Sequence, residues 1–232
     1  MLDGSGTPKD VIACLRREMR DFEGTAVSHA LELAFAPDAH IRLCHPLGDM
    51  VGPQALYENA FAPLAAALPD LERRDLSVIS GEDDEGYRWV GCAGHYMGTF
   101  RAPILDIPPT GHLAHMRYHE FYRIEDNRVV EMQAIWDLSE LMMQANAWPM
   151  TPSLGREFCV PGPMSQDGLT PSQDRASEED SRSLVLNMLT QLSRHPSEGG
   201  PEIMQAECFW HPRMNWYGPA GIGSARGIDG FR

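Results

Sequence analysis

The side chains of this sequence best suited to chemistry lie within one stretch, residues 86–144. Glu120 and Asp137 are carboxylates, which can remove an acidic proton and return it where burial raises their pKa toward neutrality. His95 could hydrogen-bond a carbonyl oxygen and polarise it. Carboxylates and a histidine are residue types that can perform acid/base chemistry.

The alternation of residues 113–124 predicts a strand but leaves the direction of Glu120 open. One face of that strand would carry Met116, Tyr118, Glu120 and Tyr122. The other face would carry His115, Arg117, His119, Phe121 and Arg123. Glu120 is a buried carboxylate beside Tyr118 if the first face points inward, and a solvated side chain if the second does.

Asp137 also has two readings. It precedes the predicted helix 138–146, where an aspartate commonly caps the first turn, and capping and proton transfer are compatible.

His112, His115 and His119 recur at intervals of three and four residues. That spacing gathers metal ligands on a helix but not on a strand, so we expect no metal site.

The elements that must position these residues are three long antiparallel strands, 87–100, 113–124 and 129–138. Asp126 and Asn127 separate the last two, and Asn tolerates the positive φ of a tight hairpin turn. Upstream, apolar spacing predicts helices over 8–22, 24–35 and 53–68, with strands near 41–43 and 71–80. Helices followed by a run of strands indicate an α+β fold.

Three motifs carry a family resemblance: GHYMGTF, IPPTGH and FYRIEDNRVVEMQAIWDLSELMMQ. In their types and order they resemble the SnoaL-like polyketide cyclases, a branch of the NTF2-like fold, over residues 9–146. That fold is a cone in which three N-terminal helices pack on a strongly curved, mostly antiparallel sheet. Asn127 stands where the family usually has Gly, and Asn is the ordinary substitute at such a turn.

The resemblance implies an apolar pocket inside the cone and an intramolecular aldol-type ring closure without metal or cofactor. Asp137 would be the general acid/base, with Glu120 and His95 as further catalytic candidates. The candidates for contact with a small hydrophobic substrate are Tyr118, Trp136, Trp89, His45, Met116 and Tyr122. A non-catalytic ligand-binding domain and a scaffold that forms a homodimer through the sheet are the alternatives.

Composition narrows the classes of partner. The formal net charge is −14 and Lys9 is the single lysine, which argues against nucleic acid, because its binding relies on basic contacts to phosphate. No apolar run approaches the ~20 residues of a membrane span. Five scattered cysteines without a CxxC pair predict reduced thiols in a cytoplasmic protein.

After residue 148 the sequence predicts a proline-rich linker, 149–175, packed on the first domain through Phe158 and Val160. Residues 176–232 then retrace the opening of the chain: CFWHPRMNWYGPAGIGSARGIDGF lies over AFAPDAHIRLCHPLGDMVGPQAL, with Gly227 on Gly52. We therefore expect a truncated second copy of the domain, poorly ordered or able to pair with the first copy.

Overall fold

The computed structural model describes residues 7–157, 162 and 175–232. These residues divide into two compact units, one up to residue 149 together with 162, and one of residues 150–157 with 175–232. The predicted packing of Phe158 and Val160 lies outside the described residues.

Helices precede the strands of the first unit, as the sequence predicts. They are α1 (Pro8–Val11), α2 (Ala13–Glu18), α3 (Gly24–Ala34), α4 (Pro53–Leu56), a π-helical turn (Tyr57–Phe61), α5 (Ala62–Ala67) and α6 (Leu138–Gln144). The single helix expected over 8–22 is two short helices instead, because Ile12 leaves the helical conformation (φ −100°, ψ 5°).

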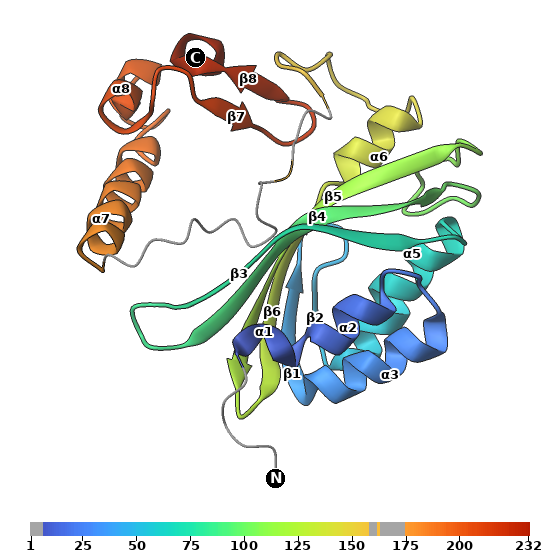
Figure 1. Cartoon of the computed structure of the whole chain (residues 1–232). Coiled ribbons are helices and arrows are strands. Elements are labelled where there is room, and N and C mark those ends of the chain that lie inside the picture. The colour runs from blue at the N-terminus through green and yellow to red at the C-terminus, as the bar shows by residue number, and fades with distance from the viewer. Residues whose placement is uncertain (1–6, 158–161, 163–174) are drawn as a thin grey trace. The chain divides into compact units, whose positions relative to one another are not determined.

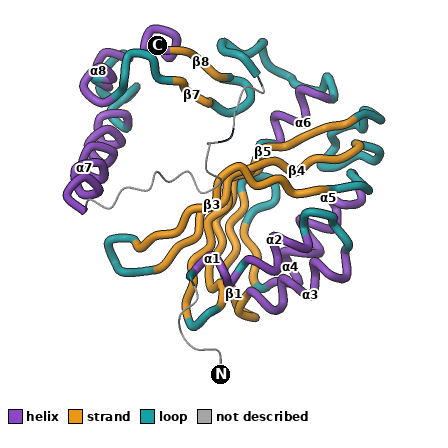
Figure 2. Tube along the Cα trace, in the orientation of Figure 1, coloured by secondary structure: helices purple, strands orange, loops and turns teal. Residues whose placement is uncertain are grey.

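Six strands form one sheet in the order β2-β1-β6-β5-β4-β3. Their bounds are β1 (Phe35–Leu43), β2 (Asp49–Val51), β3 (Glu72–Glu82), β4 (Arg88–Thr99), β5 (Leu113–Glu125) and β6 (Arg128–Trp136). Only the β1–β6 pair is parallel within this sheet. Helices α2, α3 and α5 gather on one face of the curved sheet (Figure 1), and Figure 2 shows the strands as one continuous layer. The predicted α+β cone is confirmed.

Turn residues explain how the long strands connect. Asp126 and Asn127 have φ values of 45° and 59°, the left-handed pair that a two-residue hairpin requires.

Strand β1 begins at Phe35, although the sequence analysis placed this residue in a helix. Pro37 is tolerated there because the register of β1 against β6 shifts between Phe35 and His40, which removes the need for a ladder hydrogen bond.

The second unit contains three α-helices, a short 3-10 helix and a two-stranded hairpin among its described residues. They are α7 (Arg175–Leu192), the 3-10 helix (Pro201–Met204), α8 (Ala206–Phe209), β7 (Asn215–Tyr217), β8 (Ser224–Arg226) and α9 (Gly227–Phe231). Trp210, Trp216 and Phe231 pack together with ring centroids 4.7–6.3 Å apart. Residues 175–231 thus contain helices and a hairpin, where the sequence analysis expected poor order or packing against the first copy.

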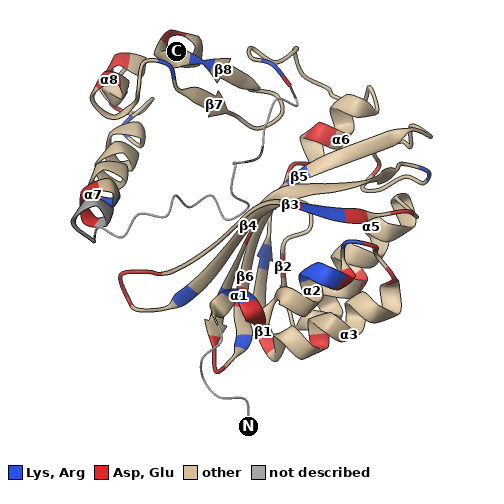
Figure 3. Cartoon of the chain, in the orientation of Figure 1, with Lys and Arg blue, Asp and Glu red and all other residues tan. Residues whose placement is uncertain are grey.

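The structure shows where the basic side chains and the cysteines lie and how apolar the helices are. In the described part of the chain, basic side chains are dispersed over several elements (Figure 3). None of the helices that the structure describes has the length and apolar character needed to cross a membrane. Four described cysteines, Cys14, Cys44, Cys92 and Cys208, are free thiols.

Candidate functional site

Strand alternation places a set of polar and aromatic side chains inside the cone. Residues paired directly across neighbouring antiparallel strands share a face. Glu120 of β5 pairs with Cys92 of β4 and with Ala134 of β6, and all three are buried. Of the two directions that the sequence leaves open for Glu120, the structure shows the inward one.

The Glu120 carboxylate is the centre of this set. Its Oε1 accepts hydrogen bonds from the Tyr96 hydroxyl (2.7 Å) and from the Trp136 indole N–H (3.0 Å). Its Oε2 accepts from Arg73 Nη1 (2.6 Å) and from the Tyr122 hydroxyl (2.5 Å). Glu120 is 0% exposed and none of these partners exceeds 3%. A carboxylate offers about four acceptor sites, so all of them are used.

Arg73 supplies the positive charge, and one of its donors is unused. Its Nε donates to Asp75 (2.9 Å) and its Nη1 also reaches the Tyr96 hydroxyl (3.1 Å). The guanidinium lies 4.3 Å from the centroid of the Tyr118 ring. Its Nη2 is buried and has no hydrogen-bond partner among the described residues. A buried donor of this kind carries a desolvation cost, which an acceptor atom placed beside it would relieve.

Asp75 extends the network toward α2. It accepts from Arg16 Nε (2.8 Å) and from the Tyr118 hydroxyl (2.5 Å). Gly94 makes this possible, because a Cβ there would lie 2.5 Å from the Tyr118 hydroxyl and 2.1 Å from the Arg74 carbonyl oxygen. The glycine of the GHYMGTF motif therefore creates room for a buried hydrogen bond.

The pKa values follow from burial and from the two cations. Burial disfavours the charged form of Asp75, but Arg73, the Tyr118 hydroxyl and Arg16 outweigh it and hold the pKa of Asp75 below its ordinary value. Burial and the Glu120 charge raise the pKa values of Tyr96 and Tyr122. Both phenols therefore stay protonated and can only donate to the carboxylate.

The opposite face of the same strands carries a second polar group. His95 pairs with Arg117 across β4 and β5, and its ring lies 5.7 Å from that of His115. Arg117 Nη2 contacts Asp137 Oδ2 at 3.4 Å. His95 and Asp137 thus lie on the outer face of the sheet, and Glu120 lies on the inner face.

Burial keeps the outer-face histidines neutral. Burial, followed by His115 and Arg117, lowers the pKa of His95 to about 4. Burial also lowers the pKa of His115, and burial and Arg117 lower that of His119.

The residues after β6 act on the backbone of β5. Asp137 occupies the N-cap position of α6, but its side chain makes no capping hydrogen bond. From α6, Glu140 accepts from the Arg117 backbone N–H (2.5 Å), and Gln144 bonds both the N–H and the carbonyl of His115 (3.0 and 2.6 Å). Strand β6 ends at Trp136, and beyond that point the side chains of Glu140 and Gln144 bond the backbone of β5 in its place.

The predicted substrate contacts divide in the same way. Tyr118, Trp136, Met116 and Tyr122 lie on the inner face and are buried. Trp89 is on the outer face, where its indole N–H donates to Asp83 (2.8 Å), so it does not join the buried residues around Glu120.

His45 is exposed in the turn between β1 and β2. This position does not support a place among the buried residues of the cone.

Sequence analysis missed Arg73, Asp75 and Tyr96. A signal was available, because Leu71, Arg73 and Asp75 have the same parity in a predicted strand, so an apolar residue at 71 already implied an inward arginine. For metals, no group of three or more ligating side chains is found within the described residues.

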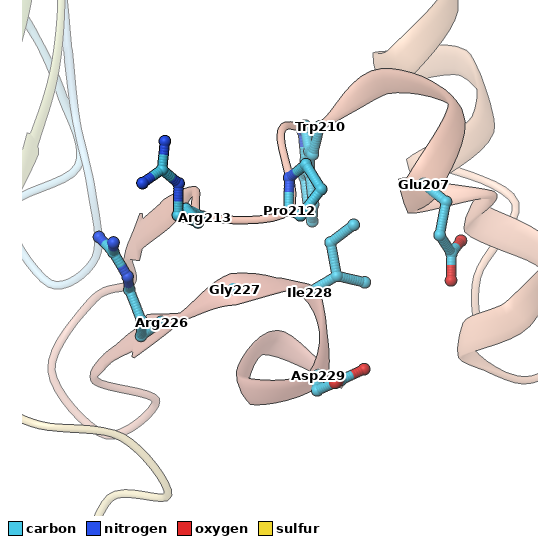
Figure 4. Close-up of a pocket in the computed structure, with 8 residues that line it drawn as sticks. All are labelled: Glu207, Trp210, Pro212, Arg213, Arg226, Gly227, Ile228 and Asp229. Atoms are coloured by element: carbon cyan, nitrogen blue, oxygen red, sulfur yellow. The ribbon is translucent and has the colours of Figure 1, made fainter.

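A separate cavity of about 490 Å³ lies within the second unit. Figure 4 shows Arg213 and Arg226 at one end of it and Glu207 and Asp229 at the other. Because the lining carries two cations and two carboxylates, its charge favours neither anionic nor cationic ligands.

Comparison with known proteins agrees with the fold. The model of the family described as SnoaL-like polyketide cyclase matches residues 13–145. The structure resembles IdmH of Streptomyces antibioticus, with TM-score 0.50 and 23% identity, over 61% of this chain and 99% of that one. It also resembles TsrD of Streptomyces laurentii, with TM-score 0.50 and 20% identity, over 63% of this chain and 99% of that one. No curated protein matches the sequence.

Proposed function

The chain belongs to the SnoaL-like polyketide cyclase family, and from this premise we propose that it is a cyclase or isomerase that moves a proton on a small enolisable molecule inside the cone. One observation carries the proposal: the Glu120 carboxylate and the unused Arg73 Nη2 donor belong to the same buried network.

The two groups have complementary roles in such a reaction. Glu120 removes a proton α to a carbonyl group, and the electrons move onto the carbonyl oxygen. Arg73 Nη2 is the group that would donate to that oxygen as negative charge develops, in a site from which water is excluded. Ring closure or isomerisation then consumes the enolate, and Glu120 returns the proton. No cofactor is needed for this sequence of steps.

Entry of a substrate requires one of the four donors on Glu120 to be displaced. Each of those hydrogen bonds has a net stabilisation of about 1.5–3 kcal/mol, because the acceptor is charged. The carbonyl oxygen of a substrate compensates this by pairing with Arg73 Nη2. An aromatic or polycyclic ketone is the substrate class we propose, since Tyr96 and Trp136 bond the carboxylate and their rings pack together beside Tyr118.

The test is hydrogen–deuterium exchange at the α-carbon of ketones. A thermal-shift panel of aromatic and polycyclic ketones first identifies ligands, since a ligand at about 100 times its dissociation constant stabilises the fold by ~2.7 kcal/mol. NMR in D₂O then follows loss of the α-proton signal. The proposal predicts enzyme-dependent exchange, whereas a ligand that stabilises the protein without exchange would indicate a binding module.

A homodimer through the sheet is a second proposal, which rests on the outer face. Ile79, Phe121 and Ile135 are exposed there by 44%, 43% and 62%. A shallow groove of about 300 Å³ runs beside Trp89 and Phe121. Burying such side chains between two copies contributes about 25 cal/mol per Å². Sedimentation should show a dimer that Phe121→Ser weakens, and an unchanged monomer at all concentrations would contradict this.

A further inference from the structure

The four donors that enclose Glu120 differ in how firmly they are held. Arg73 carries the compensating charge and also bonds Asp75, and the Tyr96 hydroxyl contacts Arg73 as well as Glu120. The indole of Trp136 has a single polar group, and its 3.0 Å hydrogen bond is the longest of the four. Displacing Trp136 therefore breaks one hydrogen bond and leaves the Arg73–Glu120 ion pair intact.

One helical residue, Phe61, covers both donors to Glu120 Oε1. Its ring centroid lies 5.3 Å from that of Trp136 and 6.1 Å from that of Tyr96. Phe61 is 1% exposed, and it also packs on Phe22 at 6.3 Å. Because Trp136 and Tyr96 bond the same carboxylate oxygen, the ring of Phe61 shields that side of Glu120.

The backbone that carries Phe61 is the π-helical turn between α4 and α5. The Ala62 N–H donates to the Tyr57 carbonyl, five residues earlier, instead of the residue four positions earlier that an α-helix would use. Pro63 follows directly and has no N–H to donate. Single π-helical turns within α-helices are rare and occur frequently at functional sites. Phe61 thus stands on an irregular piece of helix.

The other carboxylate oxygen is covered from the sheet. Tyr122, a donor to Oε2, packs edge-on against Phe35 with ring centroids 6.1 Å apart. Phe35 is fully buried, begins β1 and pairs with Val129 of β6. Movement of Phe35 disturbs the strand pairing of the cone, whereas movement of Phe61 disturbs one helical turn. The Oε1 side of Glu120 is therefore the easier one to reach.

We propose that Phe61 is the specificity-determining residue of this site, and that a substrate reaches Glu120 Oε1 past Phe61 by taking the place of the Trp136 indole. The class that fits is a flat bicyclic ketone. An indole is a flat pair of fused rings, and a molecule that replaces it packs against the same two rings, those of Phe61 and Tyr96. The chemistry that follows rests on the proposed function, but the side of entry does not.

Exchange of the Trp136 indole N–H with D₂O measures this entry directly. The proton is buried against Glu120, so it exchanges only when the hydrogen bond opens. NMR should show that Phe61→Leu speeds the exchange about tenfold relative to the slowest backbone amides of β5, which report global unfolding. Phe61→Met is a second variant that should act in the same direction, because a flexible side chain fills the space with little strain.

Phe35→Leu is the matched control. Phe35 is as deeply buried as Phe61 and packs edge-on against another donor to Glu120, Tyr122. Its replacement should lower the melting temperature but leave the ratio of Trp136 exchange to global exchange unchanged. Equal acceleration by the Phe61 and Phe35 variants, or none in either, would overturn the proposed side of entry.

Two ketones test the selectivity: indanone, whose fused rings have the size of an indole, and cyclopentanone, a single ring. Saturating indanone should shift the indole resonance of Trp136. Phe61→Leu should raise the α-proton exchange of indanone relative to that of cyclopentanone about tenfold, because a tight apolar contact discriminates by that order. An unmoved Trp136 resonance or an unchanged ratio would overturn the role of Phe61. If neither ketone exchanges with any of the proteins, the proposed reaction fails, while the Trp136 measurements still decide the side of entry.

Discussion

The two faces of strand β5 have opposite chemistry although their residues alternate one by one. The inner face holds Tyr118, Glu120 and Tyr122, all within 1% of complete burial. The outer face holds Arg117 and His119 beside Asp137, and there Arg117 is 8% exposed and the Asp137 side chain 10%. Glu120 accepts four hydrogen bonds, one of them from the Arg73 cation at 2.6 Å, whereas the Asp137 carboxylate lies 3.4 Å from the Arg117 cation. The two faces thus hold two differently paired carboxylates, and we assign the proposed acid/base chemistry to the inner one.

The largest expected effect comes from removing the inner cation. Arg73→Met leaves Glu120 buried without its 2.6 Å ion pair, which should cost about 3–5 kcal/mol of unfolding free energy. Chemical denaturation of the variant measures this loss.

Its control is the double variant Arg73→Met with Glu120→Gln, which removes both charges and should regain a substantial part of the stability. If Arg73→Met alone were as stable as the natural protein, the inner face would not depend on this ion pair.

The next effect tests the space behind Tyr118. Gly94→Ala places a Cβ against the Arg74 carbonyl and the Tyr118 hydroxyl, and overpacking of this kind should cost about 1–3 kcal/mol or more. Gly81→Ala, in the neighbouring strand β3, is the matched control because nothing lies within 4 Å of its Cβ position. Equal melting temperatures for the two variants would show that the inner face can relax around the added methyl group.

Asp137→Asn should have a small effect on stability. Its contact with Arg117 is 3.4 Å long, and the amide keeps an acceptor oxygen, so a loss of about 1 kcal/mol or less is expected. Thermal melting checks this. A loss comparable to that of Arg73→Met would place the important carboxylate on the outer face.

The smallest effect concerns pH. His95 has its pKa lowered from 6.5 to about 4, so the unfolded chain binds this proton more readily than the folded one. The stabilisation is complete above pH 6.5 and is lost as the pH falls from about 6.5 toward 4. His95→Gln should flatten the fall of melting temperature in that window. An unchanged slope would show that His95 is as accessible to protons in the folded state as in the unfolded one.

The sequence predicted the fold well because the strands of the cone are long and regular. The turn at Asp126 and Asn127 and the apolar alternation of β5 both specify backbone geometry locally. The break at Ile12 and the early start of β1 at Phe35 were missed, because each depends on packing against the sheet.

The site was only half predictable for a related reason. Glu120 and its aromatic neighbours lie on one strand, and alternation alone gathers them. Arg73 and Asp75 come from β3, and Arg73 stands 47 residues before Glu120 in the sequence. Their contacts with the Glu120 network depend on how the sheet curves. Asp137 was placed by motif, yet the end of β6 at Trp136 turns it to the outer face.

The most direct test compares α-proton exchange of one ketone ligand by the natural protein, Glu120→Gln and Asp137→Asn. Glu120→Gln keeps the shape of the site but removes the base, so exchange should fall to the uncatalysed rate, while Asp137→Asn should retain most of it. Exchange that survives in Glu120→Gln and disappears in Asp137→Asn would contradict the assignment of the chemistry to the inner face.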